Sequence, residues 1–138
     1  YKDDNHCFAC GKLNPNGLHM KVDRNQGRAQ AELVLKPEHQ GWKGMAHGGL
    51  VSTVLDEIMA HAVIDQVPQA ATVELTVRFK APVPLGKPLE AKGWISYRNK
   101  RLIKAEGELR LKASDQLLAQ AESKFIVPSP SNASETLS

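Results

Sequence analysis

A long apolar segment at residues 45–64 most strongly constrains the fold of this chain. Its hydrophobic side chains recur at positions 50, 51, 54, 55, 58, 59, 62 and 63, which is helical spacing, and small alanines fill much of the remainder. The pattern predicts a helix that is apolar on nearly every face and therefore buried. Asp56 stands in its middle, where a carboxylate costs free energy unless partners or water reach it. Asp56 is therefore a candidate functional residue.

The segments on either side of this helix alternate apolar and polar residues, which is the pattern of half-buried strands. A single antiparallel sheet has one face to cover, and the economical cover is the apolar helix. We therefore predict an α+β fold in which a curved antiparallel sheet of about six strands wraps around one long central helix. The expected strands lie at residues 18–22, 28–35, 72–81, 87–98, 101–113 and 116–127.

The chain has the size and composition of one globular domain. It has 138 residues, of which 41% are hydrophobic and 24% are charged. We place the domain at residues 18–127. An N-terminal arm at residues 1–17, rich in turn-forming residues, precedes it. A C-terminal tail at residues 128–138 follows, and we expect the tail to be disordered because it has little to bury.

Charge and hydropathy exclude two classes of protein. The net charge of +3 comes from dispersed basic residues, which is far less than a dedicated nucleic-acid binder shows. No apolar run is long enough for a membrane span, and no secretory signal pattern opens the chain. We therefore expect a cytoplasmic protein. Tyr1 is not a start methionine, which leaves room for an upstream targeting segment.

The two cysteines form a Cys-x-x-Cys pair, Cys7 and Cys10, directly after His6. This spacing suits half a zinc site or a redox pair. A tetrahedral zinc site needs four ligands, so His19 or a partner chain would have to complete it. We expect two reduced thiols in an N-terminal turn, with no metal and no cofactor.

The arrangement around the helix resembles one known family. The residues that carry the resemblance are His47-Gly48-Gly49, the acid nine positions after that histidine at Asp56, the strand at residues 72–79, Pro82, and Pro84-Leu85-Gly86. Together they are similar to the hotdog-fold acyl-CoA thioesterases, and within these to the PaaI-like group of the 4-hydroxybenzoyl-CoA thioesterase superfamily.

The resemblance continues into the N-terminal arm. Cys7-Phe8-Ala9-Cys10-Gly11, Asn14-Pro15 and Gly17-Leu18 also look like members of that superfamily, so the similarity covers about residues 6–127. It implies a hotdog fold assembled as a homodimer or homotetramer. It also implies an acyl-CoA substrate that is hydrolysed to a carboxylic acid and free coenzyme A.

The resemblance assigns the central chemistry to Asp56, which either attacks the thioester carbonyl or activates a water to do so. Some family members place Glu at the catalytic position, which makes Glu57 the alternative. On the helix, however, Glu57 points away from Asp56 and lies one turn from His61, which favours a surface ion pair between them.

Two glycines at a helix start leave the first backbone amides open to an oxyanion. We predict that the Gly48 amide stabilises the tetrahedral intermediate of thioester hydrolysis, with Gly49 as the alternative donor. His47 is expected to orient the loop or the thioester carbonyl. Eight residues of helix separate Gly48 from Asp56 by about 12 Å, so both cannot touch one carbonyl within one chain. This geometry predicts a site shared between two subunits.

The remaining site predictions concern a threonine, a glutamine and a group of basic residues. Similar enzymes carry a Ser or Thr where Thr72 stands, and it hydrogen-bonds the carboxylate or the water. Thr72 alternates with the polar set of its strand, so it reaches Asp56 only through a bulge at the strand start or across a dimer interface. Where some relatives have an Asn near the oxyanion site this chain has Gly41, and Gln40 beside it is the replacement that we predict. The basic residues that would meet the phosphates of coenzyme A are Arg98, Lys100 and Arg101, with Arg78 and Lys80 as further candidates.

The sequence therefore predicts an acyl-CoA thioesterase. Two alternatives use the same fold. A hotdog dehydratase would need a histidine and an acid arranged to move protons on a carbon chain, and the mid-helix position of Asp56 argues against it. A non-catalytic acyl-CoA sensor would bind the ligand without turnover.

Overall fold

The structure, a computed structural model, describes residues 5–128; of the tail predicted to be disordered, residues 128–138, all but Pro128 lies outside the described part. Within residues 5–128 the chain forms one helix, one short 3-10 turn and six strands. The elements are β1 (Lys21–Asn25), β2 (Arg28–Leu33), η1 (Pro37–His39), α1 (Gly48–Ile64), β3 (Ala71–Phe79), β4 (Leu89–Arg98), β5 (Leu102–Leu111) and β6 (Gln116–Ile126).

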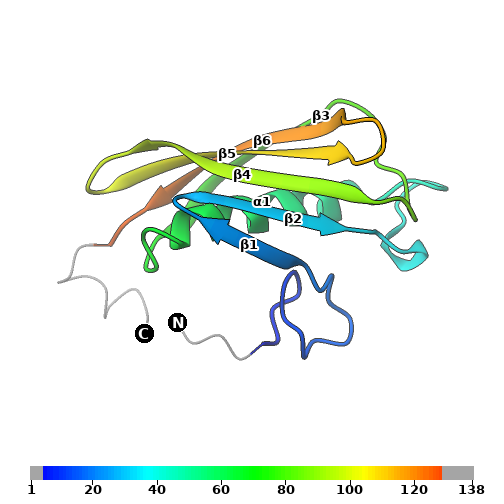
Figure 1. The fold of residues 1–138 in the computed structure, drawn as a ribbon, viewed down its shortest axis with the longest axis horizontal. Coiled ribbons are helices and arrows are strands. Elements are labelled where there is room, and N and C mark those ends of the chain that lie inside the picture. Colours follow the sequence, from blue (N-terminus) through cyan, green and yellow to red (C-terminus); the bar gives the residue numbers. More distant parts are fainter. Residues whose placement is uncertain (1–4, 129–138) are drawn as a thin grey trace.

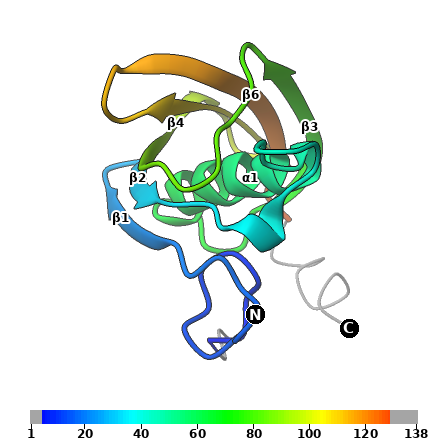
Figure 2. The same cartoon turned by 90° about the vertical axis from the view of Figure 1, so that its right-hand side faces the viewer.

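All neighbouring strands are antiparallel, in the order β1-β2-β4-β5-β6-β3. The last three strands form the predicted meander, and β3 joins it at the far edge beside β6. Figure 1 shows the strands as one layer with α1 along one face, and the end view in Figure 2 shows the sheet curving around α1 from β1 to β3. The predicted α+β architecture is confirmed.

The helix can lie close to the sheet because small residues face it. The inward positions of β4 and β5 include Ala91, Gly93, Ala105 and Gly107, all buried. At Gly93 a Cβ atom would lie 2.7 Å from the backbone oxygen of Ile58, so only glycine fits there. The seven buried residues of α1 fill the space between helix and sheet: Val51, Val54, Leu55, Ile58, Met59, Ala62 and Val63.

The first strand was predicted three residues too early. Residues 18–20 do not join the sheet, because Leu18 and Met20 donate backbone hydrogen bonds to Phe8 and Ala9 of the arm. The hairpin then closes through a two-residue loop, Gln26 and Gly27, whose φ angles of 52° and 76° are both positive. Such a loop matches the twist of paired strands, so β1 can extend to Asn25.

Strand β3 differs from its predicted half-buried state. Its apolar residues Val73, Leu75 and Phe79 are 55%, 37% and 54% exposed, and Val77 is half-buried. The cause is position: β3 is an edge strand with β6 as its neighbour, and α1 lies mainly against β4 and β5. An edge strand with exposed apolar side chains is a surface suited to pairing with another chain.

Candidate active site

The start of α1 presents one backbone amide that is free to bind an anion. His47 is the N-cap, and its Nδ1 accepts a hydrogen bond from the Gly49 amide at 2.9 Å. The amides of Leu50 and Val51 donate to the His47 carbonyl. The Gly48 amide has no acceptor among residues 5–128, and Gly48 is exposed. The first helical turn therefore offers the Gly48 N–H, together with the positive end of the helix dipole.

The loop before α1 is held in place by its own contacts. The His47 amide donates to the His39 carbonyl at 2.9 Å, and the ring of His39, which is buried, accepts from the Lys36 amide. A Cβ atom at Gly41 would lie 3.0 Å from the His47 Cα. Gln40 uses its side-chain oxygen to accept from the Gly44 amide at 2.9 Å. The loop thus fixes His47, while Gln40 is tied to the loop itself.

Asp56 lies in the middle of α1 and is half-buried. Burial raises the pKa of its carboxyl above the ordinary value, and the neighbouring Glu57 carboxylate raises that pKa further, while the hydrogen bond from Thr72 opposes both. A carboxyl whose pKa is raised is a stronger base once it is ionised, and such groups are common at catalytic sites.

Thr72 reaches Asp56 within one chain. Its Oγ1 lies 3.5 Å from Oδ1 of Asp56, at the long limit of a hydrogen bond. The register between β3 and β6 shifts between Thr72 and Glu74, so a bulge occurs at the start of the strand. The bulge turns Thr72 toward the helix although it alternates with the polar set. This is the first of the two routes that the strand pattern allowed.

Phe79, which the sequence did not single out, lies at the other end of β3 beside the helix start. A Cβ atom at Gly48 would meet its ring at 3.5 Å. The aromatic ring therefore forms an apolar wall next to the free Gly48 amide. Its signal in the sequence was only its place in the apolar alternation of β3, which does not distinguish a site residue from a core residue.

The basic turn between β4 and β5 lies at the other end of the helix. Arg98 and Lys100 border a hollow with Gln66, Val67 and Gln69, which follow the C-terminus of α1. Helix α1 has 17 residues, so roughly 25 Å of helix separate this turn from Gly48. Arg98, Lys100 and Arg101 are exposed, and within one chain they are not brought together with the Gly48 amide.

Glu57 and His61 make the predicted contact, but it is not a surface pair. His61 Nε2 lies 3.0 Å from Glu57 Oε1, and their side chains are only 12% and 20% exposed. Cys7 Sγ lies 3.9 Å from the same Glu57 oxygen. Burial acts to raise the pKa of Glu57, but hydrogen bonds from His61 and Cys10 outweigh it and hold that pKa below its ordinary value. These contacts leave Asp56 as the carboxylate available for chemistry.

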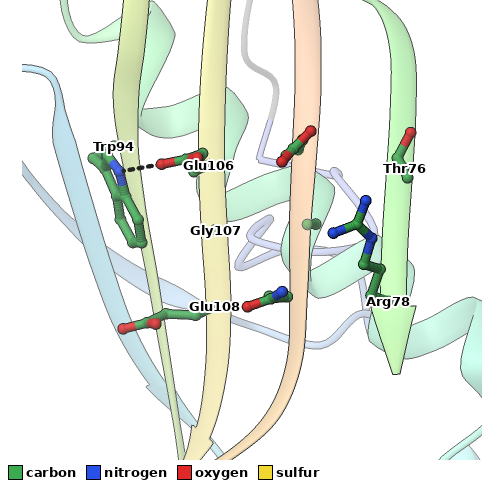
Figure 3. Close-up of a pocket in the computed structure, with 9 residues that line it drawn as sticks. Thr76, Arg78, Trp94, Glu106, Gly107 and Glu108 are labelled. Atoms are coloured by element: carbon green, nitrogen blue, oxygen red, sulfur yellow. Dashed lines mark hydrogen bonds between the residues drawn. The ribbon is translucent and has the colours of Figure 1, made fainter. Parts of the chain in front are cut away.

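A separate hollow lies on the outer face of the sheet. Figure 3 shows polar side chains there, with Thr76 and Arg78 on β3 and with Glu106 and Glu108 on β5; Trp94 donates to Glu106 at 3.0 Å. Arg78 alone of the predicted residues lines it. The sheet separates this hollow from α1, so it is not part of the arrangement around Gly48 and Asp56.

Comparison with known proteins places these residues in a family context. The family profile described as Thioesterase superfamily matches residues 43–117, more than half of the chain, and the matched region includes Gly48, Asp56 and Thr72. Human acyl-coenzyme A thioesterase 13 is 26% identical over 101 residues, which cover 72% of each chain.

Solved structures agree on the fold. A thioesterase superfamily protein superposes with a TM-score of 0.83 at 25% identity; the match covers 88% of this chain and 60% of the length of that protein. The PaaI protein of the phenylacetic acid degradation operon of E. coli superposes with a TM-score of 0.76 at 18% identity, over 81% of each chain. The hotdog fold predicted from the sequence is therefore confirmed. None of the helical segments within residues 5–128 has the length and apolar character that a membrane span requires.

Proposed function

Since the chain belongs to the thioesterase superfamily, we propose that it is an acyl-CoA thioesterase, which hydrolyses an acyl-CoA to a carboxylic acid and free coenzyme A. The observation that carries the mechanism is that the backbone amides of Gly48 and Gly49 differ in their hydrogen bonding. His47 occupies the Gly49 N–H, and the Gly48 N–H is left open at the helix start. An open amide aimed from a helix N-terminus stabilises the oxyanion that forms when the thioester carbonyl is attacked.

Asp56 supplies the other half of the reaction. Its carboxylate either removes a proton from the attacking water or attacks the carbonyl itself, after which the C–S bond breaks and the sulfur of coenzyme A leaves. The Thr72 hydroxyl holds Asp56 or the water in place. Gln40, whose oxygen is engaged by Gly44, has its NH2 group as the remaining donor toward the substrate.

The site is shared between two subunits. Gly48 and Asp56 of one chain are about 12 Å apart along α1, too far to reach the same carbonyl. Gly48 of one chain therefore acts with Asp56 of another. Strand β3 is the surface that we assign to this pairing, because its edge and its apolar residues Val73, Leu75 and Phe79 are exposed in the single chain. A two-fold axis through β3 would pair the strand with its copy and produce two equivalent sites. The protein is accordingly a homodimer, or a homotetramer built from two such dimers.

The two-subunit arrangement also gives the basic turn a role. Arg98, Lys100 and Arg101 lie far from the Gly48 amide of their own chain, so a partner's turn is the one that would meet the phosphates of a substrate bound there.

The oxyanion role of Gly48 can be tested by a pair of variants that the local geometry permits. His47 has φ −63° and ψ 133°, the conformation that precedes proline, and Gly48 is the first helical residue, where proline is tolerated. Gly48→Pro therefore removes the N–H without disturbing α1. Gly48→Ala is the matched control, because its Cβ meets only the Phe79 ring, at 3.5 Å, and the amide is retained.

We expect Gly48→Pro to lower kcat by roughly 10²–10³-fold, and Gly48→Ala to stay near wild type, in a thiol-release assay over short, medium, long and aromatic acyl-CoAs. Asp56→Ala should abolish turnover in the same assay. Wild-type turnover in Gly48→Pro would refute the oxyanion assignment, and binding without turnover in the wild type would instead identify a sensor. Mixed dimers of Gly48→Pro and Asp56→Ala chains should recover one working site; no recovery would exclude the shared site.

A single turnover in oxygen-18 water can identify a nucleophilic Asp56. The nucleophile forms a mixed anhydride with the acyl group, and attack of water on the Asp56 carboxyl carbon then leaves the heavy oxygen in the protein and a light oxygen in the product acid. A general base never labels the protein, so heavy oxygen in Asp56 would exclude that role.

A further inference from the structure

We propose that Cys7, Cys10 and Glu57 bind a zinc ion, and that His61 orients the Glu57 carboxylate. The ion would link the N-terminal arm to α1, the helix that carries Asp56. Ligand atoms of the first three residues all lie within 4.8 Å of one another. The sequence showed only the Cys-x-x-Cys pair and left its completion to His19 or to a partner chain. In the structure the Nε2 of His19 lies 2.5 Å from the Asn14 carbonyl, and the third member comes from α1, fifty residues away from Cys7.

The backbone holds the two cysteines in position without any metal. The Gly11 amide donates to the Cys7 carbonyl at 2.9 Å, and a Cβ atom at Gly11 would lie 2.3 Å from the Cys7 nitrogen, so the turn requires glycine. Between the cysteines, Ala9 is 2% exposed and its carbonyl accepts from the Met20 amide. Figure 2 shows this arm against α1 on the side opposite the sheet. The loop is therefore a fixed scaffold, and neither cysteine is in a disulfide.

After small side-chain rotations the distances fit three protein ligands of a tetrahedral zinc site, with a water molecule in the fourth position. Zinc–sulfur bonds near 2.3 Å and zinc–oxygen bonds near 2.0 Å place a ligand sulfur and oxygen about 3.5 Å apart. Cys7 Sγ and Glu57 Oε1 are already 3.9 Å apart. Two thiolates and one carboxylate form a donor set that suits zinc, and the hard cations Mg²⁺ and Ca²⁺ prefer all-oxygen sets.

The charges around the cluster also fit a dication. Two thiolates and a carboxylate carry three negative charges, and Zn²⁺ reduces this total to one. Arg24 of β1 lies close enough to act on the Glu57 carboxylate, and its guanidinium offsets the remaining charge.

His61 is the positioning residue of this site. Its Nε2 lies 3.0 Å from Glu57 Oε1, and its Nδ1 is buried with no hydrogen-bond partner in the described part of the chain. Hydrogen bonds to ligating carboxylates fix their orientation, and loss of such a partner typically weakens metal affinity by roughly 10–100-fold. His61 thus presets the Glu57 carboxylate toward the two sulfurs.

The test uses full-length protein, freed of any histidine tag, stripped with a chelator and kept reduced with a phosphine. It is titrated with Co²⁺, which gives a thiolate-to-cobalt charge-transfer band, and the cobalt is then displaced by Zn²⁺ to obtain the zinc affinity. Protection of the thiols against alkylation is measured in parallel. We expect one metal ion per chain, with tetrahedral cobalt bands and protected thiols.

Four variants assign the ligands. Cys7→Ser and Cys10→Ser should each weaken the charge-transfer band, and Glu57→Gln should lower zinc affinity at least about tenfold. His61→Phe, which keeps a packed ring, should lower it by roughly 10–100-fold. His19→Gln is the matched control and should bind zinc as the wild type does.

Reduced wild-type protein that shows no charge-transfer band would overturn the proposal, whether or not any variant folds. Equal zinc affinity in Glu57→Gln and the wild type, with both folded by circular dichroism, would also overturn it. So would rapid oxidation of Cys7 and Cys10 to a disulfide without metal uptake, because that result identifies a redox pair.

Discussion

Substitution of Gly93 by alanine tests how closely the sheet holds the helix that carries Asp56. A Cβ atom at this position would lie 2.7 Å from the Ile58 oxygen and 2.9 Å from the Ile58 carbonyl carbon. Ordinary contacts begin near 3.4 Å, so the α1 backbone would have to move by about 0.7 Å. Overpacking of this kind costs about 1–3 kcal/mol, and we expect the upper end because the obstacle is helix backbone.

Gly107 provides the matched control. It pairs directly with Gly93 across β4 and β5, and it also faces α1. A Cβ atom at Gly107 would lie 3.0 Å from Met59 Cγ and 3.4 Å from both Met59 Sδ and the Lys92 carbonyl oxygen, so the flexible Met59 side chain has to shift by only a few tenths of an ångström. Replacing glycine by alanine within a strand also gains about 0.5–1 kcal/mol. Gly107→Ala should therefore change the free energy of unfolding by less than about 1 kcal/mol.

The assay is thermal and urea unfolding of both variants at one protein concentration, since the stability of any oligomer depends on concentration. A difference of 2–3 kcal/mol corresponds to a melting-temperature gap of roughly 8 °C for a chain of this size. Gly93→Ala should also lower kcat, because Ile58 lies two residues from Asp56. If the two variants unfold at the same temperature, the close approach of α1 to β4 is not what sets their stability.

Three further outcomes follow from the same structure. Thr72→Val removes the hydroxyl beside Asp56 and should lower kcat by about three- to tenfold, while Thr72→Ser should keep the wild-type kcat. The measurement is steady-state thiol release, and a valine variant as fast as the wild type would show that Thr72 is not part of the site. Leu75→Lys places a charge on the exposed edge strand and should shift the protein toward monomers in sedimentation velocity, whereas an unchanged dimer would move the interface away from β3. Asp65 has a pKa held below its ordinary value by hydrogen bonds from the Gly27 amide and the Gln66 side chain. The stability it contributes is present above the unfolded pKa of about 3.9 and is lost as the pH falls through the lower folded pKa. The gap in urea midpoint between wild type and Asp65→Asn should therefore be open at pH 7 and close in strong acid; a gap independent of pH would contradict this.

The sequence by itself determined the helix α1, and it predicted the chemistry that we propose for its residues. Apolar spacing predicted a helix within residues 45–64, and α1 runs from Gly48 to Ile64 with Asp65 as its cap. Local periodicity suffices here because a helix must bury an apolar face that recurs every turn. The distance between Gly48 and Asp56, and the prediction that their site is shared between two chains, also follow from helix geometry alone. The structure adds the reason to prefer Gly48, since the His47 ring occupies the Gly49 amide.

Tertiary structure decided what depends on contacts between distant segments. No local pattern shows that β3 lies at a sheet edge, and its apolar residues alternate as they would in a covered strand. The start of β1 was misplaced because backbone bonds from residues 18–20 to the arm compete with strand pairing. The link between Cys7 and Glu57 spans fifty residues and arises only when the arm packs on α1. Periodicity shows which face of a segment is apolar and must be buried. Which other segment covers that face depends on the packing of the whole fold.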